Sequence, residues 1–326
     1  MNTELVSILI PVYNRENFIE ETVNSALRQT YKNIEIIIVD NKSVDSTWEV
    51  VKRLASHDKR IKIFQNETNI GPVKNWKRCI KEANGKYGKI LFSDDLMAFD
   101  FIEKTIDYLK DYSIGFVFTG REIFKNNKEK TTLSYMTIGD TNIFPSSKYI
   151  NGVLFGKNYP NSPGCALFRL KDLNENLIID VPNKIHSDFS MHGIGSDLLL
   201  FLITSSKYKN FAFINENLAY FRAHDGSITI DSGSGKLLLM YAVAKAFFIE
   251  NYLKNNKEII HNFNSQLKLL MFQYDARKFL LNEIDDFYSK NNIYSFSKII
   301  YIKCILIMIK KVAKNILGKK YIRQKI

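Results

Sequence analysis

The chain has 326 residues, a length that fits one large domain or two domains of ordinary size. Hydrophobic residues make up 45% of the sequence and charged residues 25%, so the chain has the composition of a globular protein and enough apolar material for a sizeable core. The three cysteines, Cys79, Cys165 and Cys304, lie far apart and form no metal-ligand pattern. Their spacing indicates a reducing compartment and no disulfide framework.

The charge is unevenly distributed. The formal net charge is +12, and the stretch from residue 287 to residue 326 contains no Asp or Glu. Ten basic residues lie in that stretch: Lys290, Lys298, Lys303, Lys310, Lys311, Lys314, Lys319, Lys320, Arg323 and Lys325. The remainder of the chain is therefore nearly balanced, which favours a basic C-terminal appendage over a diffuse nucleic-acid-binding surface. We expect no nucleic-acid partner.

The N-terminus has no features of a secretory signal. Its apolar run is short, follows no basic residues and breaks at Pro11. No stretch approaches the roughly 20 apolar residues that a membrane span requires. We therefore expect a cytoplasmic protein.

Apolar strand-like runs alternate with amphipathic segments over the first 120 residues. Strands are expected at 6–10, 34–39, 61–64, 87–92 and 114–119, and helices at 16–29, 46–54, 72–83 and 101–109. Ser46 is the expected N-cap of the second helix, and Gly85 the expected C-cap of the third. This alternation predicts an α/β fold, with a Rossmann-like, mostly parallel sheet flanked by helices.

The later sequence is less regular. Residues 125–161 are rich in Asn, Ser, Thr and Gly and are expected to form a loop region, followed by strands at 165–169 and 211–221. From residue 236 onward the pattern is mainly helical, which predicts a helical C-terminal extension that could also mediate self-association into a homo-oligomer.

Polar side chains follow three of the expected strands. These strand ends carry Pro11, Val12, Tyr13 and Asn14, then Asp40 and Ser43, then Asp94 and Asp95. Ligands of parallel sheets bind beyond the carboxyl ends of the strands. A carboxylate can accept hydrogen bonds from a base or ribose, a tyrosine can stack on a base, and a divalent cation can bridge phosphates to carboxylates. These groups suit a nucleoside diphosphate, although a single Asp-Asp pair is common on any surface.

The order of these motifs resembles that of the inverting glycosyltransferases of family 2, which have the A-type glycosyltransferase fold. The motifs that carry the resemblance are Ile10–Asn14, Val39–Asp40 with Ser43, Asp45–Thr47, Asn69–Gly71 and Phe92–Asp95. The similarity covers roughly residues 5 to 120 and continues loosely to Ser227. It implies that Asp94 and Asp95 form the DxD-type motif, with Asp95 on a Mn²⁺ or Mg²⁺ ion and Asp94 on the donor. Since Ser93 precedes the pair, this division of roles is open.

The resemblance also implies a catalytic base, because inverting transfer needs a group that takes the proton of the acceptor hydroxyl. Asp197 precedes an apolar run and is expected at a helix N-terminus, where it is the leading candidate; Asp188 is the alternative. An acid that merely caps the helix would have the same sequence context.

Further residues are assigned by their place in the family order. His224, in the segment from Tyr220 to Ile228, would complete the metal shell, although a lone His is more often structural. The expected donor-binding residues are Pro11, Val12, Tyr13, Asn14, Asp40, Ser43, Lys74, Asp94 and Arg222. Gly164 and Cys165 are expected to border the acceptor.

The segment from Ile299 to Leu317 has the pattern of a basic amphipathic helix. Lys303, Lys310 and Lys314 share one helical face, and apolar residues cover much of the remainder. Such a helix can lie on an anionic membrane surface, or it can pack on its own protein with a solvated lysine face. We expect the membrane contact, which would place the protein on the inner face of the cytoplasmic membrane.

The resulting hypothesis is an inverting, metal-dependent glycosyltransferase. It would move a sugar from a nucleotide-sugar, with a UDP-sugar favoured, to a glycan or lipid-linked acceptor in capsule, O-antigen or related polysaccharide synthesis. Residues 1–230 would form the catalytic domain, with a donor half (1–120) and an acceptor half (121–230), and residues 231–326 the helical region. A sugar nucleotidyltransferase and a non-catalytic nucleotide-sugar-binding module are the alternatives. The first of these is expected to have a Gly-rich loop after its first strand, where residues 11–14 contain no glycine.

Overall fold

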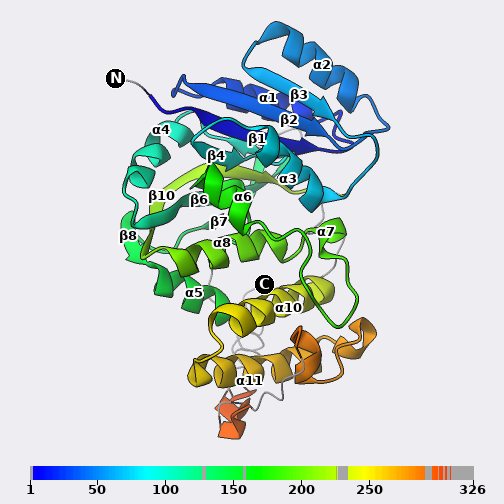
Figure 1. Cartoon of the computed structure of the whole chain (residues 1–326), viewed down its shortest axis with the longest axis vertical. Coiled ribbons are helices and arrows are strands. Elements are labelled where there is room, and N and C mark those ends of the chain that lie inside the picture. The colour runs from blue at the N-terminus through cyan, green and yellow to red at the C-terminus, as the bar shows by residue number, and fades with distance from the viewer. Residues whose placement is uncertain are drawn as a thin grey trace, which may run out of the picture. The chain divides into compact units, whose positions relative to one another are not determined.

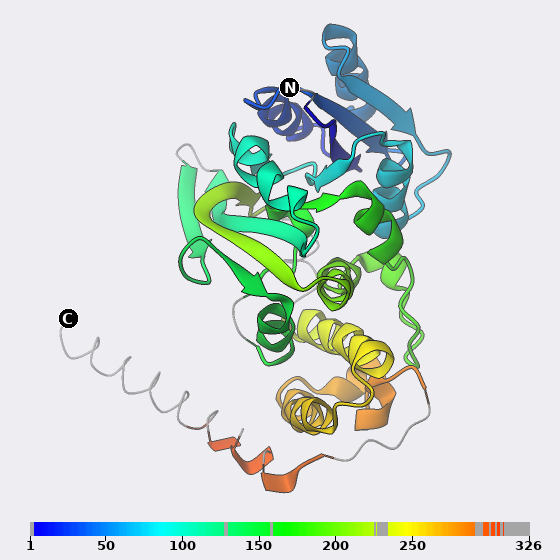
Figure 2. The same ribbon diagram turned by 60° about the vertical axis from the view of Figure 1, so that its left-hand side comes forward.

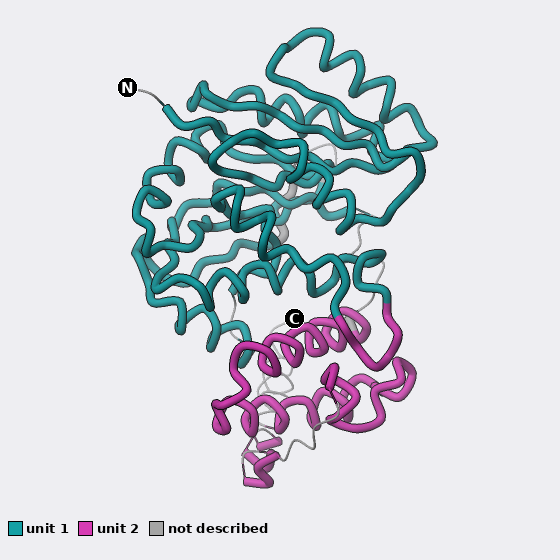
Figure 3. Tube along the Cα trace, viewed as in Figure 1, with its two compact units in different colours: residues 1–181, 188–233 teal, residues 182–187, 234–326 magenta. Residues whose placement is uncertain are grey.

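The computed structural model describes residues 3–126, 130–156, 159–224, 226, 234–290, 296–299, 301–303, 305–306 and 309. The chain divides into two compact units (Figure 3). The first comprises residues 1–181 and 188–233, and the second comprises 182–187 and 234–326.

The first unit is built on a ten-stranded sheet. Eight strands follow the order β3-β2-β1-β4-β9-β6-β10-β5, and the other two, β7 and β8, pair with β6 and β10. The strands are β1 (Val6–Val12), β2 (Ile34–Asp40), β3 (Ile61–Gln65), β4 (Tyr87–Ile90), β5 (Leu96–Met97), β6 (Ile114–Asn126), β7 (Lys130–Met136), β8 (Asn142–Pro145), β9 (Ala166–Arg169) and β10 (Asn210–Arg222). Strands β3, β2, β1 and β4 are mutually parallel, whereas β9 is antiparallel to both of its neighbours, β4 and β6. Figure 2 shows the long, parallel strands β6 and β10 side by side.

Helices cover both faces of this sheet. They are α1 (Ile19–Leu27), α2 (Thr47–His57), α3 (Pro72–Glu82), α4 (Phe101–Ile106), α5 (Ser146–Leu154), α6 (Leu170–Asn176), α7 (Phe189–His192) and α8 (Ser196–Lys207). In Figure 1, α3, α6 and α8 lie on the viewer's side of the sheet. The architecture is the α/β class expected from the alternating sequence pattern.

The side chains of β1 point alternately to the two faces of the sheet and are buried on both. Val6, Ile8, Ile10 and Val12 are buried in a single apolar cluster with residues of α1, α2 and α4. Leu9 points to the opposite face, where a Cβ on Gly88 would lie 3.7 Å from its side chain. Each such side chain contributes roughly 1.5–3 kcal/mol by leaving water. A strand buried on both faces is typical of a parallel sheet with helices on either side.

The observed elements differ from the expected ones in two places. Residues 125–161 are not a loop region, because they form the end of β6, the strands β7 and β8, and the helix α5. Ser46 is the N-cap of α2, as expected, although its side chain makes no capping hydrogen bond. The C-cap of α3 is Ala83, and Gly85 instead approaches Ser7 so closely that a Cβ would lie 2.5 Å from its hydroxyl.

The second unit is helical, with α10 (Ser234–Tyr252), α11 (Lys257–Gln273) and two 3₁₀ turns (Ala276–Phe279 and Ile284–Phe287). Buried Glu250 of α10 accepts hydrogen bonds from the amides of Ser289 and Lys290, at 3.1 and 2.9 Å. The described positions from 298 to 309 are helical, whereas Lys310, Lys314 and the rest of the predicted basic segment lie outside the described residues. Within the described ranges, no helix is both long and apolar enough to cross a membrane.

Candidate active site

The sheet register brings the predicted strand ends to one edge. Val12 pairs with Asp40 across β1 and β2, and Leu9 pairs with Ile90 across β1 and β4. The turn that holds Asp94 therefore follows β4 at the edge where β1 and β2 also end. This is the edge at which parallel α/β sheets bind their ligands.

The ends of β1 and β2 are joined by a polar network. Buried Asp40 accepts hydrogen bonds from the amide and hydroxyl of Ser43, at 3.1 and 2.5 Å, and from Gln65 Nε2 at 2.9 Å. Asn14, whose φ is 50°, donates its amide to the Ser43 hydroxyl at 2.9 Å. Pro11 and Val12 are buried in the strand, and Tyr13 is 38% exposed. The first two strand ends thus present one exposed aromatic ring beside one buried carboxylate.

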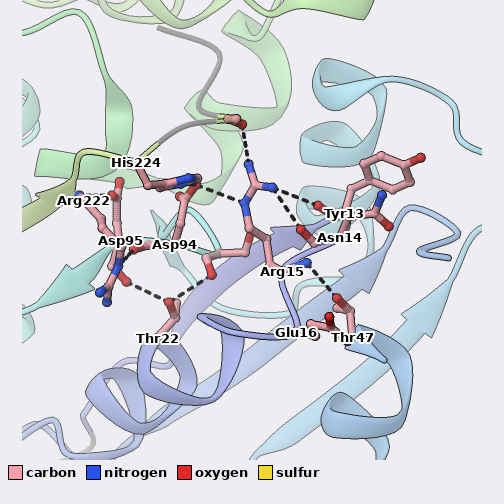
Figure 4. A network of polar contacts seen from close by, with 12 residues as sticks. Tyr13, Asn14, Arg15, Glu16, Thr22, Thr47, Asp94, Asp95, Arg222 and His224 are labelled. Atoms are coloured by element: carbon pink, nitrogen blue, oxygen red, sulfur yellow. Dashed lines mark hydrogen bonds and ion pairs between the residues drawn. The ribbon is translucent and has the colours of Figure 1, made fainter. Parts of the chain in front are cut away.

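Asp94 lies between Arg15 and His224. Its Oδ2 atom is 3.1 Å from Arg15 Nε and 2.9 Å from His224 Nε2 (Figure 4). Burial raises the pKa of Asp94, but the hydrogen bond with His224 and the charge of Arg15 outweigh that effect, so the pKa lies below the ordinary value. Asp94 is therefore held in its charged form although it is largely enclosed.

Arg15 belongs to this cluster but was not among the residues expected from the sequence. Its amide donates to Thr47 Oγ1 at 2.7 Å, and its guanidinium donates to the carbonyls of Asn14 and Gly226, at 3.0 and 3.2 Å, as well as to Asp94. Figure 4 shows Arg15 between Asp94 and the Tyr13–Asn14 backbone. The sequence feature that points to Arg15 is its position directly after the motif Ile10–Asn14, at the ligand edge of β1.

Asp95 lies deeper than Asp94 and has fewer compensating partners. Its Oδ1 accepts the amide of Arg222 at 2.9 Å, and the Thr22 hydroxyl donates to the backbone carbonyls of Ser93 and Asp95, at 3.1 and 2.9 Å. Burial and the neighbouring Asp94 raise the pKa of Asp95 well above its ordinary value. An ionised Asp95 is thus energetically unfavourable until a further positive charge arrives.

Arg222 contributes to the shape of this turn. Its guanidinium donates to the Asp94 carbonyl at 2.8 Å and to Glu21 at 2.6 Å, and it packs against the rings of Phe18 and Phe124, at 5.0 and 4.9 Å. The side chain is 1% exposed. These contacts of Arg222 therefore hold the Asp94–Asp95 turn in place.

The residues of the turn suit a divalent cation that a ligand also helps to hold. In the part of the chain that the structure describes, no three His, Cys, Asp or Glu side chains are grouped as a complete metal site. His224 contacts Asp94 at 2.9 Å, and the raised pKa of Asp95 marks a carboxylate that lacks positive charge. Asp94, Asp95 and His224 do not form such a group by themselves, so a cation here would need further ligands, which phosphate oxygens commonly supply.

The two candidate bases differ in their surroundings. Asp197 is half-buried in the first turn of α8, where its Oδ1 accepts from the amides of Gly195 and Leu198, at 2.8 and 2.7 Å. Asp188 is exposed and caps α7, where it accepts from the hydroxyl and the amide of Ser190, at 2.6 and 2.9 Å. The bond from the hydroxyl lowers the pKa of Asp188 most, and the bond from the amide and the charge of the exposed Lys74 lower it further. Both acids therefore make N-terminal helix contacts, and only Asp197 is partly enclosed.

The segment that carries both acids packs on α3. Gly71, with φ 84°, lies so close to α7 that a Cβ would meet Met191 Sδ at 2.6 Å. The Trp76 ring lies 5.3 Å from the ring of Phe92, next to the acidic turn, and a Cβ on Gly193 would lie 3.2 Å from Trp76. Trp76 thus lies between the acidic turn and the segment that leads to Asp197.

The expected acceptor residues are buried in the structure. Lys89 of β4 is fully buried and donates to the carbonyls of Ile90 and Gly164, at 2.8 and 2.5 Å. Burial lowers the pKa of Lys89 to about 8 and raises that of the Cys165 thiol to about 11. Cys165 donates its thiol to the Ser162 carbonyl at 3.3 Å. Only the backbone of this turn, and not the thiol, is positioned by polar contacts with β4.

Comparison with known proteins identifies the class to which this fold and edge site belong. The family model for glycosyl transferase family 2 matches residues 7–177. The chain therefore belongs to glycosyl transferase family 2. This membership and the fold confirm the resemblance read from the strand-end motifs.

Individual relatives agree with the family. An uncharacterised glycosyltransferase of Rickettsia conorii is 30% identical over 298 residues, which cover 91% of this chain and 44% of that protein. The Escherichia coli enzyme WfaP, named as a UDP-Glc:α-D-GlcNAc-diphosphoundecaprenol β-1,3-glucosyltransferase, is 38% identical over 123 residues, which cover 38% of this chain and 48% of that protein. The chain thus spans less than half the length of these relatives.

A solved structure resembles the fold more completely. Staphylococcus aureus TarS (residues 1–349) in complex with UDP-GlcNAc matches with a TM-score of 0.63 at 19% identity, over 87% of this chain and 80% of that chain. At this level of identity the likeness is one of fold. It confirms the A-type glycosyltransferase architecture.

Proposed function

We propose that the protein is an inverting glycosyltransferase. It transfers a sugar from a nucleoside-diphosphate-sugar, with a UDP-sugar favoured, to a hydroxyl of a glycan or lipid-linked glycan in surface-polysaccharide synthesis. The observation that carries the proposal is the cluster of Asp94, Arg15 and His224 at the sheet edge where Tyr13 and Asp40 also lie.

The donor would bind along this edge in an order set by chemistry. Tyr13 offers an exposed ring for the base, and Asp40 with Ser43 offers acceptors and a hydroxyl for the nucleoside. The diphosphate would then lie at Asp95, His224 and the cationic Arg15. Lys74, exposed on the first turns of α3, is a second cation for the phosphates.

A Mn²⁺ or Mg²⁺ ion would be held by Asp95 and His224, with Asp94 on the donor. When bound, the ion neutralises charge on the leaving diphosphate. Arg222 acts on the same site indirectly, since its amide and guanidinium hold the turn of Asp94 and Asp95 in place.

Asp197 is our proposed base. It would take the proton from the acceptor hydroxyl as that oxygen attacks the anomeric carbon on the side opposite the leaving nucleotide. Its partial burial in α8 favours it over the exposed Asp188. The turn of Gly164 and Cys165 would border the acceptor through its backbone.

Names of relatives support the substrate class. WfaP is named for a UDP-sugar donor and a GlcNAc-diphospholipid acceptor, and a Bacillus subtilis relative, 36% identical over 116 residues, is named as a putative teichuronic acid biosynthesis glycosyltransferase. A lipid-linked acceptor agrees with a cytoplasmic protein that is peripheral to the membrane. A sugar nucleotidyltransferase is less favoured, because no glycine-rich phosphate loop follows β1.

The proposal is tested by donor binding and turnover together. Calorimetry with UDP-sugars and GDP-sugars should show binding in Mn²⁺ or Mg²⁺ and little binding in chelator. Product analysis should then show an inverted anomeric linkage. Equal affinity with and without the cation contradicts the metal assignment. Donor binding without transfer to any glycan acceptor, with variants of Asp197 indistinguishable from the native protein, favours a non-catalytic binding module.

A further inference from the structure

Arg121 of β6 is a cation that has no counter-charge among the residues that the structure describes. Its guanidinium packs at 5.8 Å from the ring of Phe221, and its Nη1 atom is enclosed without a hydrogen-bond partner. Among the described residues, no carboxylate forms an ion pair with it. A buried charge is normally paired or hydrogen-bonded, because leaving water is costly for an ion.

The neighbouring thiol of Cys165 does not neutralise Arg121. Cys165 is close enough for its charge to act on Arg121, but burial raises the pKa of that thiol to about 11, so it is neutral at physiological pH. The same thiol neighbours the buried Lys89, whose hydrogen bonds go to two carbonyl oxygens. Two enclosed cations therefore flank the turn of Gly164 and Cys165.

The position of Arg121 places this charge beside the proposed site. Arg121 pairs with Ala219 on β10, three residues before Arg222, whose amide contacts Asp95. Phe221, the ring beneath the guanidinium, is also next to the acceptor-side turn, since a Cβ on Gly164 would lie 3.0 Å from it. Ala219 and Phe221 alternate with Arg222 along the strand, so Arg121 lies on the face of the sheet opposite the Arg222 guanidinium.

That face also holds the proposed base. Burial raises the pKa of Tyr149, and Cys165 and Asp197 are near enough for their charges to raise it further. Arg121, the turn of Gly164 and Asp197 thus belong to one neighbourhood, on the acceptor side of the acidic turn. Arg121 as a whole is only half-buried.

We propose that Arg121 binds an anionic group of the acceptor, next to the sugar that receives the transferred residue. The inference rests on the proposed transferase function and names a feature of its substrate. A guanidinium forms paired hydrogen bonds with either a phosphate or a carboxylate. The group is therefore the diphosphate of a lipid-linked acceptor or the carboxylate of an acidic sugar.

The test compares Arg121→Met and Arg121→Lys with the native protein on three acceptors that share one sugar. One carries a lipid diphosphate, one carries the same lipid through a neutral linker, and one carries the neutral linker with a uronic acid. For the acceptor with the recognised anion, Arg121→Met should lower kcat/KM about 10- to 100-fold, mainly through the acceptor KM. The donor KM and the neutral acceptor should be unaffected, and Arg121→Lys should retain part of the activity.

Arg53→Met is the matched control, because Arg53 is an exposed arginine of α2 paired with Glu20. Arg53→Met should leave kcat/KM unchanged on all three acceptors. Thermal unfolding of Arg121→Met should show undiminished stability, since the change removes an unpaired buried charge. An equal loss on charged and neutral acceptors, or no loss on either anionic acceptor, overturns the inference.

Calorimetry separates failure of the inference from failure of the proposed function. The same acceptors are titrated into UDP-saturated protein, which requires no turnover. Arg121-dependent binding without transfer contradicts the proposed function alone. If the Arg121 variants transfer sugar and bind the acceptors as the native protein does, the anion site alone is contradicted.

Discussion

Asp95 is buried beside a second carboxylate, an arrangement that opposes folding until positive charge is supplied. The raised pKa of Asp95, caused by burial and by Asp94, expresses that cost. Sites that bind ligands often retain such costs, because the strained or desolvated group gains its favourable partner only in the complex.

Asp95→Asn should therefore stabilise the free protein while weakening cation-dependent donor binding. At neutral pH the change removes a buried charge, and we expect a gain on the order of 1 kcal/mol, or about 2–4 °C in melting temperature. Below the ordinary carboxyl pKa of 3.8, Asp95 is protonated in both the folded and the unfolded state, so the gain should vanish there. Melting curves across pH provide the measurement, and a lower melting temperature at pH 7 would contradict it.

The two candidate bases can be separated by a matched pair of substitutions. Asp197→Asn should lower kcat by about 10²- to 10⁴-fold and leave the donor dissociation constant unchanged. Asp188→Asn should leave kcat within about twofold, because that exposed acid only caps α7. Single-turnover kinetics with calorimetry measure both effects. The reverse ranking would transfer the role to Asp188.

Residue-level prediction succeeded where local sequence carried the signal. Tyr13, Asp40 and Asp94 follow apolar strands directly, so their shared edge could be inferred from the strand pattern. The role of Arg15 could not, because its partners Asp94 and Gly226 are distant in sequence and only the folded sheet brings them together. For the same reason, the ion pair between Arg222 and Glu21 could not be predicted from the sequence.

At the scale of elements, α3 supports the segment that carries Asp188 and Asp197. Gly71 permits the close approach of α7, because its φ of 84° is unfavourable for other residues and a Cβ would lie 2.9 Å from the Ser190 carbonyl. Gly139 has a comparable φ of 124° but open space around it. Substitution of either glycine would strain the backbone, but only substitution of Gly71 would also displace α7. Comparing the two variants therefore distinguishes these effects.

Gly71→Ala should destabilise the fold by about 2–4 kcal/mol and also lower kcat, because α7 must move. Gly139→Ala should cost only about 1–2 kcal/mol and leave kcat intact. Urea unfolding and steady-state kinetics measure the two variants side by side. Equal effects on kcat would show that α7 placement does not matter to catalysis.

Sequence pattern also has limits at this scale. The parallel strands β1 to β4 were predictable, because each apolar run is followed by a helix that crosses back over the sheet. The insertion of β9 antiparallel between β4 and β6 was not, since a short buried run does not reveal its direction or its neighbours. Likewise, β7 and β8 contain many polar residues and resemble loop sequence, because they lie at the margin of the sheet.

On the scale of the whole molecule, the basic C-terminus is expected to act as a membrane contact. The described helical positions Ile299, Ile302, Leu306 and Ile309 are 69%, 56%, 52% and 54% exposed, at spacings that place them on one face. An apolar stripe in a region with ten basic and no acidic residues suits an anionic lipid surface.

Truncation after Asn292 should abolish sedimentation with anionic liposomes. Binding of the full chain to neutral liposomes should be weak, and binding to anionic ones should fall as salt rises. The double variant Lys298→Glu, Lys303→Glu keeps the apolar stripe and should weaken binding without removing it. Unchanged binding after truncation would reject the membrane contact.

The strand order has a consequence for synthesis of the protein. The outer edge of β4 is covered by β9, and the acidic turn after β4 is completed by Arg222 and His224, which are translated much later. A nascent chain that ends before residue 166 would therefore display an unpaired strand edge beside an incomplete polar turn. Unpaired edges recruit strands from other chains. We expect ribosome-released fragments of this length to aggregate, and chains that reach β10 to be the first that do not.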